Sequence, residues 1–196
     1  MPKQSSSTKA TLIEVARNLF SIHGKKNVTM NDISLASKKG RRTLYTYFKS
    51  KEEIYKAVID CELNKVLKEL YLVSDESIEP DQKLTKHILT HLDAIKNAVT
   101  RNGSLRGDFF HDIYEVERTR RKIDIEEIEL IKTILREGIE KGIFKRMDIE
   151  LSSIIIFYAI KGLEVPYIRQ NISTEFDKNR GSIVEFVFQG IKKHTH

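Results

Sequence analysis

Between residues 41 and 47 the chain gathers side chains that could bind nucleic acid. Arg41 and Arg42 carry guanidinium groups, which can donate two parallel hydrogen bonds to guanine, and Thr43 can donate to a phosphate or touch a thymine methyl group. Tyr45 and Tyr47 supply hydroxyl groups that suit phosphate oxygens. This pattern predicts contact with double-stranded DNA, although a basic amphipathic helix with two core tyrosines would carry the same residues.

Two short predicted helices position these side chains. Thr29 places a hydroxyl before a first turn and is followed three residues later by a carboxylate, a pattern typical of a helix start. Gly40 lies in the break after that helix, and a second helix is predicted over residues 41–48, with Leu44 and Phe48 facing inward. Two short helices joined by a turn that contains glycine indicate a helix-turn-helix, whose second helix enters the major groove of DNA.

The positive charge of the chain is concentrated in its first quarter. Residues 1–51 hold eleven lysines and arginines and two carboxylates, a net charge of +9, whereas the other 145 residues hold 23 bases and 26 acids, a net charge of −3. A compact basic segment beside a mildly acidic body is typical of a module that binds a polyanion. A basic face that serves solubility, or one that meets a membrane surface, remains an alternative at this point.

The composition excludes several other classes of protein. The longest apolar run, residues 154–160, is far shorter than the roughly 18 residues that a membrane span needs, and the N-terminus lacks the apolar stretch of a secretory signal. The single cysteine, Cys61, excludes an internal disulfide framework and a cysteine-based zinc cluster. No phosphate-binding glycine loop or nucleophile elbow is present, so we expect a cytoplasmic protein that is not an enzyme.

The rest of the chain predicts an all-α fold of about nine helices without a convincing strand. Glycine and proline total only 12 residues, and apolar side chains recur at helical spacing. Pro80 and Asp148 are placed to begin helices, and Pro166 to end or kink one. Outside the helix-turn-helix, the predicted helices run over residues 8–23, 50–70, 80–99, 105–114, 115–140, 148–165 and 180–193.

The motif Thr29-x-x-Asp-Ile, followed by Thr43-Leu-Tyr-x-Tyr-Phe-x-Ser-Lys51-Glu, resembles the N-terminal domain of TetR/AcrR-type transcriptional regulators. The resemblance implies an all-α homodimer in which residues 1–50 form a three-helix helix-turn-helix domain that binds operator DNA. It implies that residues 51–196 form a body of about six helices for effector binding and dimerisation. It further implies a repressor that a small-molecule effector releases from its operator, without a cofactor.

The resemblance also identifies the residues expected to contact DNA. They are Thr29, Asn31, Arg41, Arg42, Thr43, Tyr45, Tyr47 and Lys51. The turn departs from the family pattern, because Lys38-Lys39-Gly40 stands where Gly-Val-Ser is usual. A lysine in a left-handed conformation would be strained, so we expect the turn to be reshaped, with Gly40 taking the unusual backbone angles.

The sequence of residues 51–196 predicts a dimer interface and an effector pocket less specifically than the motif of residues 1–50 predicts DNA binding. The helices over 148–165 and 180–193 are apolar on more than one face, which favours a second copy as partner over a fully buried central helix. The interface candidates are Ile155, Tyr158, Val184 and Phe188. A mostly apolar pocket with a few polar groups is expected between the helices of the body. Its candidates are Cys61, His87, His91, Phe110, His111, Tyr114, Tyr158 and Tyr167, although plain core or surface is the simpler interpretation of each.

A helical interaction or metal-sensing protein that does not bind an operator is the alternative function. His87 and His91 lie four residues apart on a predicted helix, a spacing that can hold a metal ion. The simpler interpretation of this pair is two histidines at the solvent edge of a helix. A second polar cluster, Asp108, His111, Asp112 and Glu115, lacks the paired Glu-x-x-His motifs of a di-iron bundle.

Overall fold

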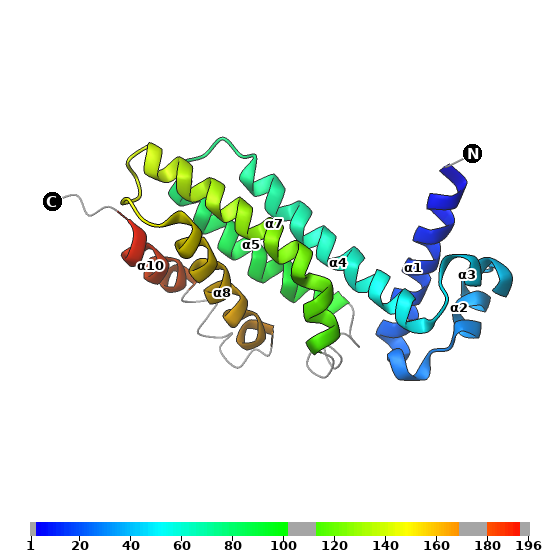
Figure 1. Ribbon diagram of the computed structural model, residues 1–196. Helices are drawn as coiled ribbons and strands as arrows, with labels where there is room; N and C mark the ends of the chain where they lie inside the picture. The colour runs from blue at the N-terminus through cyan, green and yellow to red at the C-terminus, as the bar shows by residue number, and fades with distance from the viewer. Residues whose placement is uncertain (1–2, 102–112, 169–179, 193–196) are drawn as a thin grey trace. The chain divides into compact units, whose positions relative to one another are not determined.

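The computed structural model describes residues 3–101, 113–168 and 180–192, which form eight α-helices and one short 3-10 helix (Figure 1). Within these ranges there is no β-strand, only an isolated antiparallel bridge between Phe144 and Lys192. The all-α prediction is confirmed, and most of the helix expected over 105–114 lies outside the described ranges. The elements are α1 (Lys3–His23), η1 (Lys25–Asn27), α2 (Met30–Ala36), α3 (Arg41–Tyr47), α4 (Lys51–Ser74), α5 (Pro80–Arg101), α7 (Ile113–Glu140), α8 (Ile149–Ile168) and α10 (Arg180–Ile191).

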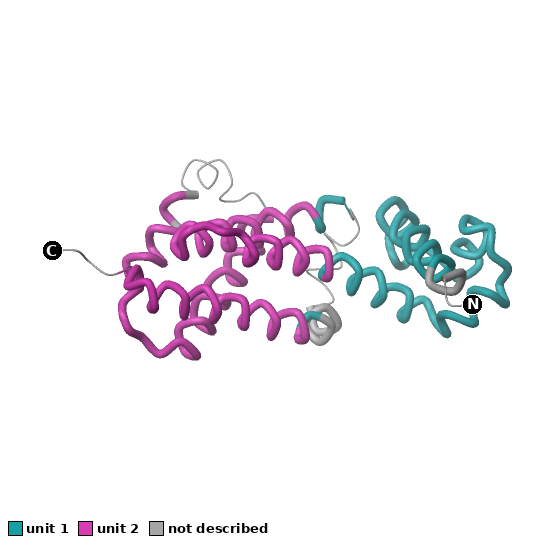
Figure 2. Tube along the Cα trace, turned by 90° about the horizontal axis from the view of Figure 1, so that it is seen from above, with its two compact units in different colours: residues 1–63, 98–120 teal, residues 64–97, 121–196 magenta. Residues whose placement is uncertain are grey.

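The chain divides into two compact units (Figure 2). The first consists of residues 1–63 and 98–120, and the second of residues 64–97 and 121–196. The domain boundary predicted at residue 50 coincides with the start of α4. The first half of α4, however, is part of the first unit, and its second half is part of the second.

In the first unit, the caps and the apolar stripes lie where the sequence predicts them. Gly24 follows α1 with a φ of +77°, the left-handed conformation that ends a helix most readily when the residue is glycine. Thr29 and Asp32 form the predicted capping box, in which the Thr29 backbone N–H donates to the Asp32 carboxylate (2.8 Å) and the Asp32 N–H donates to Thr29 Oγ1 (3.2 Å). Leu44 and Phe48 are buried, so α3 is anchored by its apolar face.

The turn between α2 and α3 differs from the prediction. Lys38 takes the left-handed conformation, with a φ of +54°, whereas Gly40 has a φ of −58° and simply precedes α3. Two hydrogen bonds close the turn around Lys38: the Lys39 N–H donates to the Ser34 carbonyl (3.3 Å), and Ser34 Oγ donates to the Lys39 carbonyl (2.7 Å). The expectation that Gly40 takes the unusual angles was therefore wrong. A left-handed non-glycine residue costs roughly 1–2 kcal/mol.

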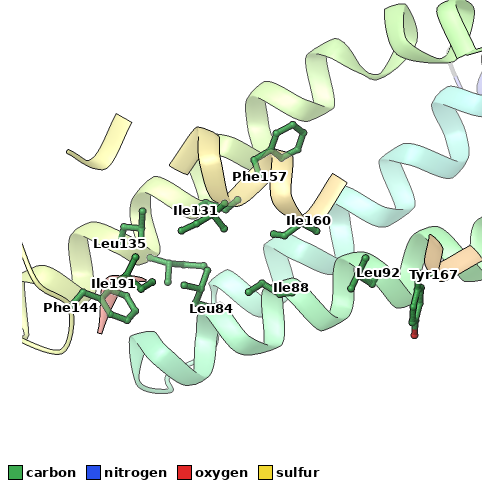
Figure 3. Packing of buried hydrophobic residues seen from close by; sticks show 12 residues of the cluster. Leu84, Ile88, Leu92, Ile131, Leu135, Phe144, Phe157, Ile160, Tyr167 and Ile191 are labelled. Atoms are coloured by element: carbon green, nitrogen blue, oxygen red, sulfur yellow. The ribbon is translucent and has the colours of Figure 1, made fainter. Parts of the chain in front are cut away.

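The second unit is built around an apolar core between α5, α7 and α8 (Figure 3). Leu84, Ile88 and Leu92 recur every four residues along α5 and are almost fully buried, so they form one continuous stripe. Side chains from the other helices and from the segment after α7 complete the core. They are Ile131, Ile134, Leu135, Phe144, Ile156, Phe157, Ile160, Tyr167 and Ile191.

The helix α8 is apolar on two faces. Asp148 caps it as predicted, accepting a hydrogen bond from the Leu151 N–H (3.0 Å), and Pro166 lies inside the helix rather than at its end. Ile156, Phe157 and Ile160 face the core. By length and hydropathy alone, α8 is the one helix in the described ranges that could cross a membrane, a test that a core helix of a water-soluble protein also passes.

Gly138 is required by the packing of Phe144. A methyl group at Gly138 would overlap the ring of Phe144, which is 2% exposed. We therefore expect Gly138→Ala to lower the free energy of unfolding by about 1–3 kcal/mol, measured by urea titration. Gly162→Ala is the matched control, because a methyl group there meets no atom within 4 Å in an exposed part of α8. Equal stability of the two variants would show that this overlap does not occur.

Candidate nucleic-acid interface

The short helix α3 presents its basic side chains to solvent. Arg41 and Arg42 are exposed at its start, and neither guanidinium is paired with a carboxylate among the residues that the structure describes. Thr43 is half-buried and Tyr45 is 44% exposed. Since Leu44 holds the opposite face against the core, α3 offers a rigid, positively charged edge with free hydrogen-bond donors.

The start of α2 contributes two further candidates of different kinds. Asn31 is exposed at the second position of the helix. The hydroxyl of Thr29 is engaged in the cap, because it also donates to the Asp32 carboxylate (2.7 Å). These hydrogen bonds from the side chain and the backbone of Thr29 lower the pKa of Asp32, which keeps the carboxylate ionised and the cap closed.

Lys51, at the start of α4, already has partners within the protein. Its ammonium group donates to the backbone carbonyl of Lys25 (2.8 Å) and more weakly to that of Lys26 (3.4 Å). Lys25 in turn places its own ammonium 3.9 Å from the ring centroid of Tyr55. The contacts of Lys51 therefore join η1 to α4. Lys26 is exposed and Lys25 is half-buried, so both lysines, which were not among the predicted DNA contacts, lie at the surface of this unit.

The candidates for the effector pocket do not converge on one cavity in the part of the chain described here. Cys61 is exposed on α4, and Tyr158 is 61% exposed on α8. Tyr167 is buried, donates a hydrogen bond to Asp93 (2.5 Å) and lies beneath the ammonium group of Lys96. Phe110, His111, Asp108 and Asp112 lie outside the described residues, as do the side chains of Tyr114 and Glu115.

His87 and His91 instead belong to a buried charge network in the second unit. They are 0% and 1% exposed, so the interpretation of a pair at the solvent edge was wrong. Their partners are Glu127 on α7 and Glu164 on α8, which are 2% and 3% exposed. His91 Nδ1 lies 2.7 Å from Glu127 Oε1, His91 Nε2 lies 2.8 Å from Glu164 Oε1, and His87 Nε2 lies 3.3 Å from Glu127 Oε1.

The geometry makes His91 an imidazolium. Ionised carboxylates only accept hydrogen bonds, so both ring nitrogens of His91 must carry protons to satisfy Glu127 and Glu164. Burial by itself would lower the pKa of His91, but the charge of Glu127 and the hydrogen bonds to both carboxylates outweigh burial and raise the pKa to about 9. Burial would likewise raise the pKa of Glu127, but the charge of His91 and the hydrogen bonds from both histidines lower it well below its usual range.

Neither this network nor any other group of described residues has the geometry of a metal site. No three His, Cys, Asp or Glu side chains among them are placed to hold one ion. The arrangement is instead a set of ion pairs that connects α5, α7 and α8, and removal of any one partner would leave an uncompensated charge in the interior of the unit.

An open groove of about 1000 Å³ runs between α5 and α10 in the second unit. Leu89 of α5 and the α10 residues Val184 and Phe188 form its apolar part. Thr85 and Asp93 of α5 add polar atoms. A groove of this size and mixed lining can accept a small amphipathic molecule.

An exposed apolar stripe runs along the outer face of α8. Ile155 is 59% exposed and Tyr158 61%, and Leu151 and Ile154 continue the stripe at helical spacing. Of the other two interface candidates, Val184 is buried within the chain and Phe188 is half-buried against the core. Phe186 on α10, which was not among the predicted interface residues, is 79% exposed.

Comparison with known proteins agrees with this architecture. Residues 12–58 match the family model described as bacterial regulatory proteins, tetR family. The uncharacterized HTH-type transcriptional regulator YhgD of Bacillus subtilis is 24% identical over 188 residues, which span 93% of this chain and 96% of the relative. The HTH-type transcriptional repressor KstR2 of Mycolicibacterium smegmatis is 26% identical over 162 residues, 76% of this chain and 74% of the relative.

A solved structure shows the same fold over nearly the whole chain. A transcriptional regulator of the TetR/AcrR family from Thermobifida fusca superposes with a TM-score of 0.73 at 20% identity. The match covers 93% of this chain and 97% of that one. It therefore extends beyond the helix-turn-helix to the body of the protein.

Proposed function

We propose that this chain is a homodimeric repressor of the TetR/AcrR family of helix-turn-helix transcriptional regulators, which binds operator DNA until a small-molecule effector releases it. The observation that carries the proposal is the exposed pair Arg41 and Arg42 at the start of a short helix anchored by Leu44. The name of one relative, the repressor KstR2, supports repression as the mode of action.

In this proposal the residues around α3 divide between base readout and phosphate binding. Arg41 and Arg42 enter the major groove, where a guanidinium can bind the O6 and N7 atoms of guanine, and Thr43 lies beside them. The hydroxyl groups of Tyr45 and Tyr47 donate to phosphate oxygens on the flanks. Asn31, Thr29 and Lys51 complete the phosphate contacts, with Thr29 and Lys51 acting from positions fixed by their hydrogen bonds within the protein.

The outer stripe of α8 supports a second copy of the chain as partner. Leu151, Ile154, Ile155 and Tyr158 follow the spacing i, i+3, i+4 and i+7, so they form one continuous apolar face opposite the residues that α8 buries in its own core. A face of this kind is typical of a protein interface. A two-fold axis there would pair two α3 helices, which matches a pseudo-palindromic operator.

The effector is proposed to act on the second unit. The groove between α5 and α10 offers an apolar floor with a few polar atoms, which suits a small amphipathic molecule. An effector releases DNA only if it binds the DNA-free conformation more tightly than the DNA-bound one.

The substitution Ile155→Asp tests whether the outer stripe of α8 forms the dimer interface and whether DNA binding depends on the dimer. The change places a carboxylate in the outer stripe of α8 at a side chain that is 59% exposed in the single chain, so the fold should persist while the dimer dissociates. We expect a monomer by sedimentation, and an affinity for DNA from the region upstream of the gene that is about 100-fold weaker or more, since two linked half-sites are lost.

Ile125→Asp is the control for this variant. Ile125 is 55% exposed on α7 and lies outside the stripe, so the substitution adds the same charge at an equally exposed isoleucine. It should remain dimeric and bind DNA as the wild type does. If the two variants sediment alike, α8 is not the dimer interface.

A further inference from the structure

Lys38 has a left-handed backbone conformation, which glycine adopts at a lower cost in free energy. It is the one non-glycine residue with a positive φ among the residues that the structure describes. The turn enforces this conformation, because the Lys38 N–H donates to the Leu35 carbonyl (3.1 Å) and the residues on either side are hydrogen-bonded to α2. Glycine adopts this conformation without strain, so folding alone does not explain a lysine here.

The side chain of Lys38 contributes nothing visible to the folded protein. It is exposed, and no carboxylate, carbonyl or aromatic ring among the described residues pairs with its ammonium group. A strained residue that the surrounding structure holds in place, and whose side chain has no internal partner, points to a role in binding.

The surroundings of Lys38 indicate what it binds. Lys38, Lys39, Arg41 and Arg42 place four positive charges within five residues, with no acidic side chain between them. The nearest acid in the preceding helix, Asp32, is held by Thr29 in the capping box. Such crowding of like charges is unfavourable in the free protein and becomes favourable beside a polyanion.

We infer that Lys38 is a phosphate-binding residue of the turn, which neutralises a DNA backbone phosphate next to the bases that α3 reads. This inference rests on the proposed function, because it assigns an additional contact to the same DNA-binding surface. Lys38 is exposed three residues before Arg41, so its ammonium group is available to a backbone phosphate while Arg41 and Arg42 reach the bases. The turn thus adds one cationic contact for each protomer.

The salt dependence of DNA binding tests the inference. Each neutralised phosphate contributes about 0.9 to the steepness of the slope of log affinity against log salt concentration. A dimer contains two copies of Lys38, so removing this charge should make the slope shallower by about 1.8. The variant is Lys38→Asn, because asparagine tolerates the left-handed conformation without a charge. Lys38→Arg keeps the charge and should restore both the affinity and the slope.

Two controls make the result specific. Lys68→Gln removes one positive charge from an exposed position on α4 in the second unit and should leave the slope unchanged. Lys38→Gly relieves the strained conformation, so it should unfold at the same or a higher urea concentration than the wild type while binding DNA more weakly. A loss of DNA affinity without a loss of stability separates phosphate binding from a structural role.

The outcomes distinguish this inference from the proposed function. If the wild type shows no preference for any duplex, the proposed function itself fails. If the wild type binds an operator and Lys38→Asn binds it with the same affinity and slope, Lys38 does not contact phosphate. If Lys38→Asn binds more weakly but Lys38→Arg fails to restore binding, the charge of Lys38 is not what matters, and the inference is overturned.

Discussion

Glu127→Ala should lower the free energy of unfolding by about 3–5 kcal/mol, the usual cost of removing one partner from a buried ion pair. Glu127 is 2% exposed and accepts hydrogen bonds from both His91 and His87, so its removal leaves His91 with one carboxylate and His87 without its partner. Urea titration followed by circular dichroism at pH 6 measures the change.

The matched control for Glu127→Ala is Glu140→Ala at the exposed end of α7. It removes the same carboxylate from the same helix at a position open to solvent, and it should change stability by no more than about 0.5 kcal/mol. Two variants of equal stability would mean that the network does not support the second unit.

The pH dependence of stability provides an independent check on the same network. The pKa of His91 is raised in the folded protein to about 9, above the ordinary value of 6.5, so its contribution is fully present below pH 6.5 and is lost as the pH rises through 9. The wild type should therefore lose a few kcal/mol between pH 6.5 and 9. Glu127→Ala should show a smaller loss over this interval, because the carboxylate whose charge raises the pKa of His91 is gone.

Arg41→Ala should weaken binding to the preferred operator by about 1–3 kcal/mol for each half-site and should relax the preference for one base pair. Arg41 is exposed at the start of α3 with no carboxylate partner in the described part of the chain, so its loss leaves the fold intact. Fluorescence anisotropy with the operator and its single-base variants measures both effects.

Tyr45→Phe is the comparison for Arg41→Ala. It removes only a hydroxyl from a side chain that is 44% exposed and should weaken binding by a similar factor on every sequence. A loss for Arg41→Ala that is equally uniform would show that Arg41 holds a phosphate and does not read a base.

The local features of the fold could be predicted because their signals lie within a few residues of one another. The capping box of Thr29 and Asp32 spans one turn, and the inward positions Leu44 and Phe48 follow helical spacing. The two faces of α8 also follow from spacing, since five consecutive apolar residues at 100° per residue cannot all face one core.

The features that could not be predicted depend on contacts between distant segments or on exact backbone geometry. Glu127 and Glu164 lie 36 and 73 residues from His91, so no local pattern reveals that the histidines are buried and paired. The left-handed residue of the turn is Lys38 and not Gly40 because hydrogen bonds to Ser34 decide the path of the chain, and these outweigh the preference of glycine.

If α3 reads double-stranded DNA as one half of a symmetric pair, selection of bound duplexes from a random DNA library will reveal the sequence that it prefers. With the full chain at low ionic strength, we expect enrichment of a pseudo-palindromic sequence whose two half-sites are centred one helical turn, or a multiple of it, apart. Arg41→Ala should lose the enrichment at one base pair of each half-site. A library that stays random after repeated rounds with the wild type would show that α3 does not read DNA in this way.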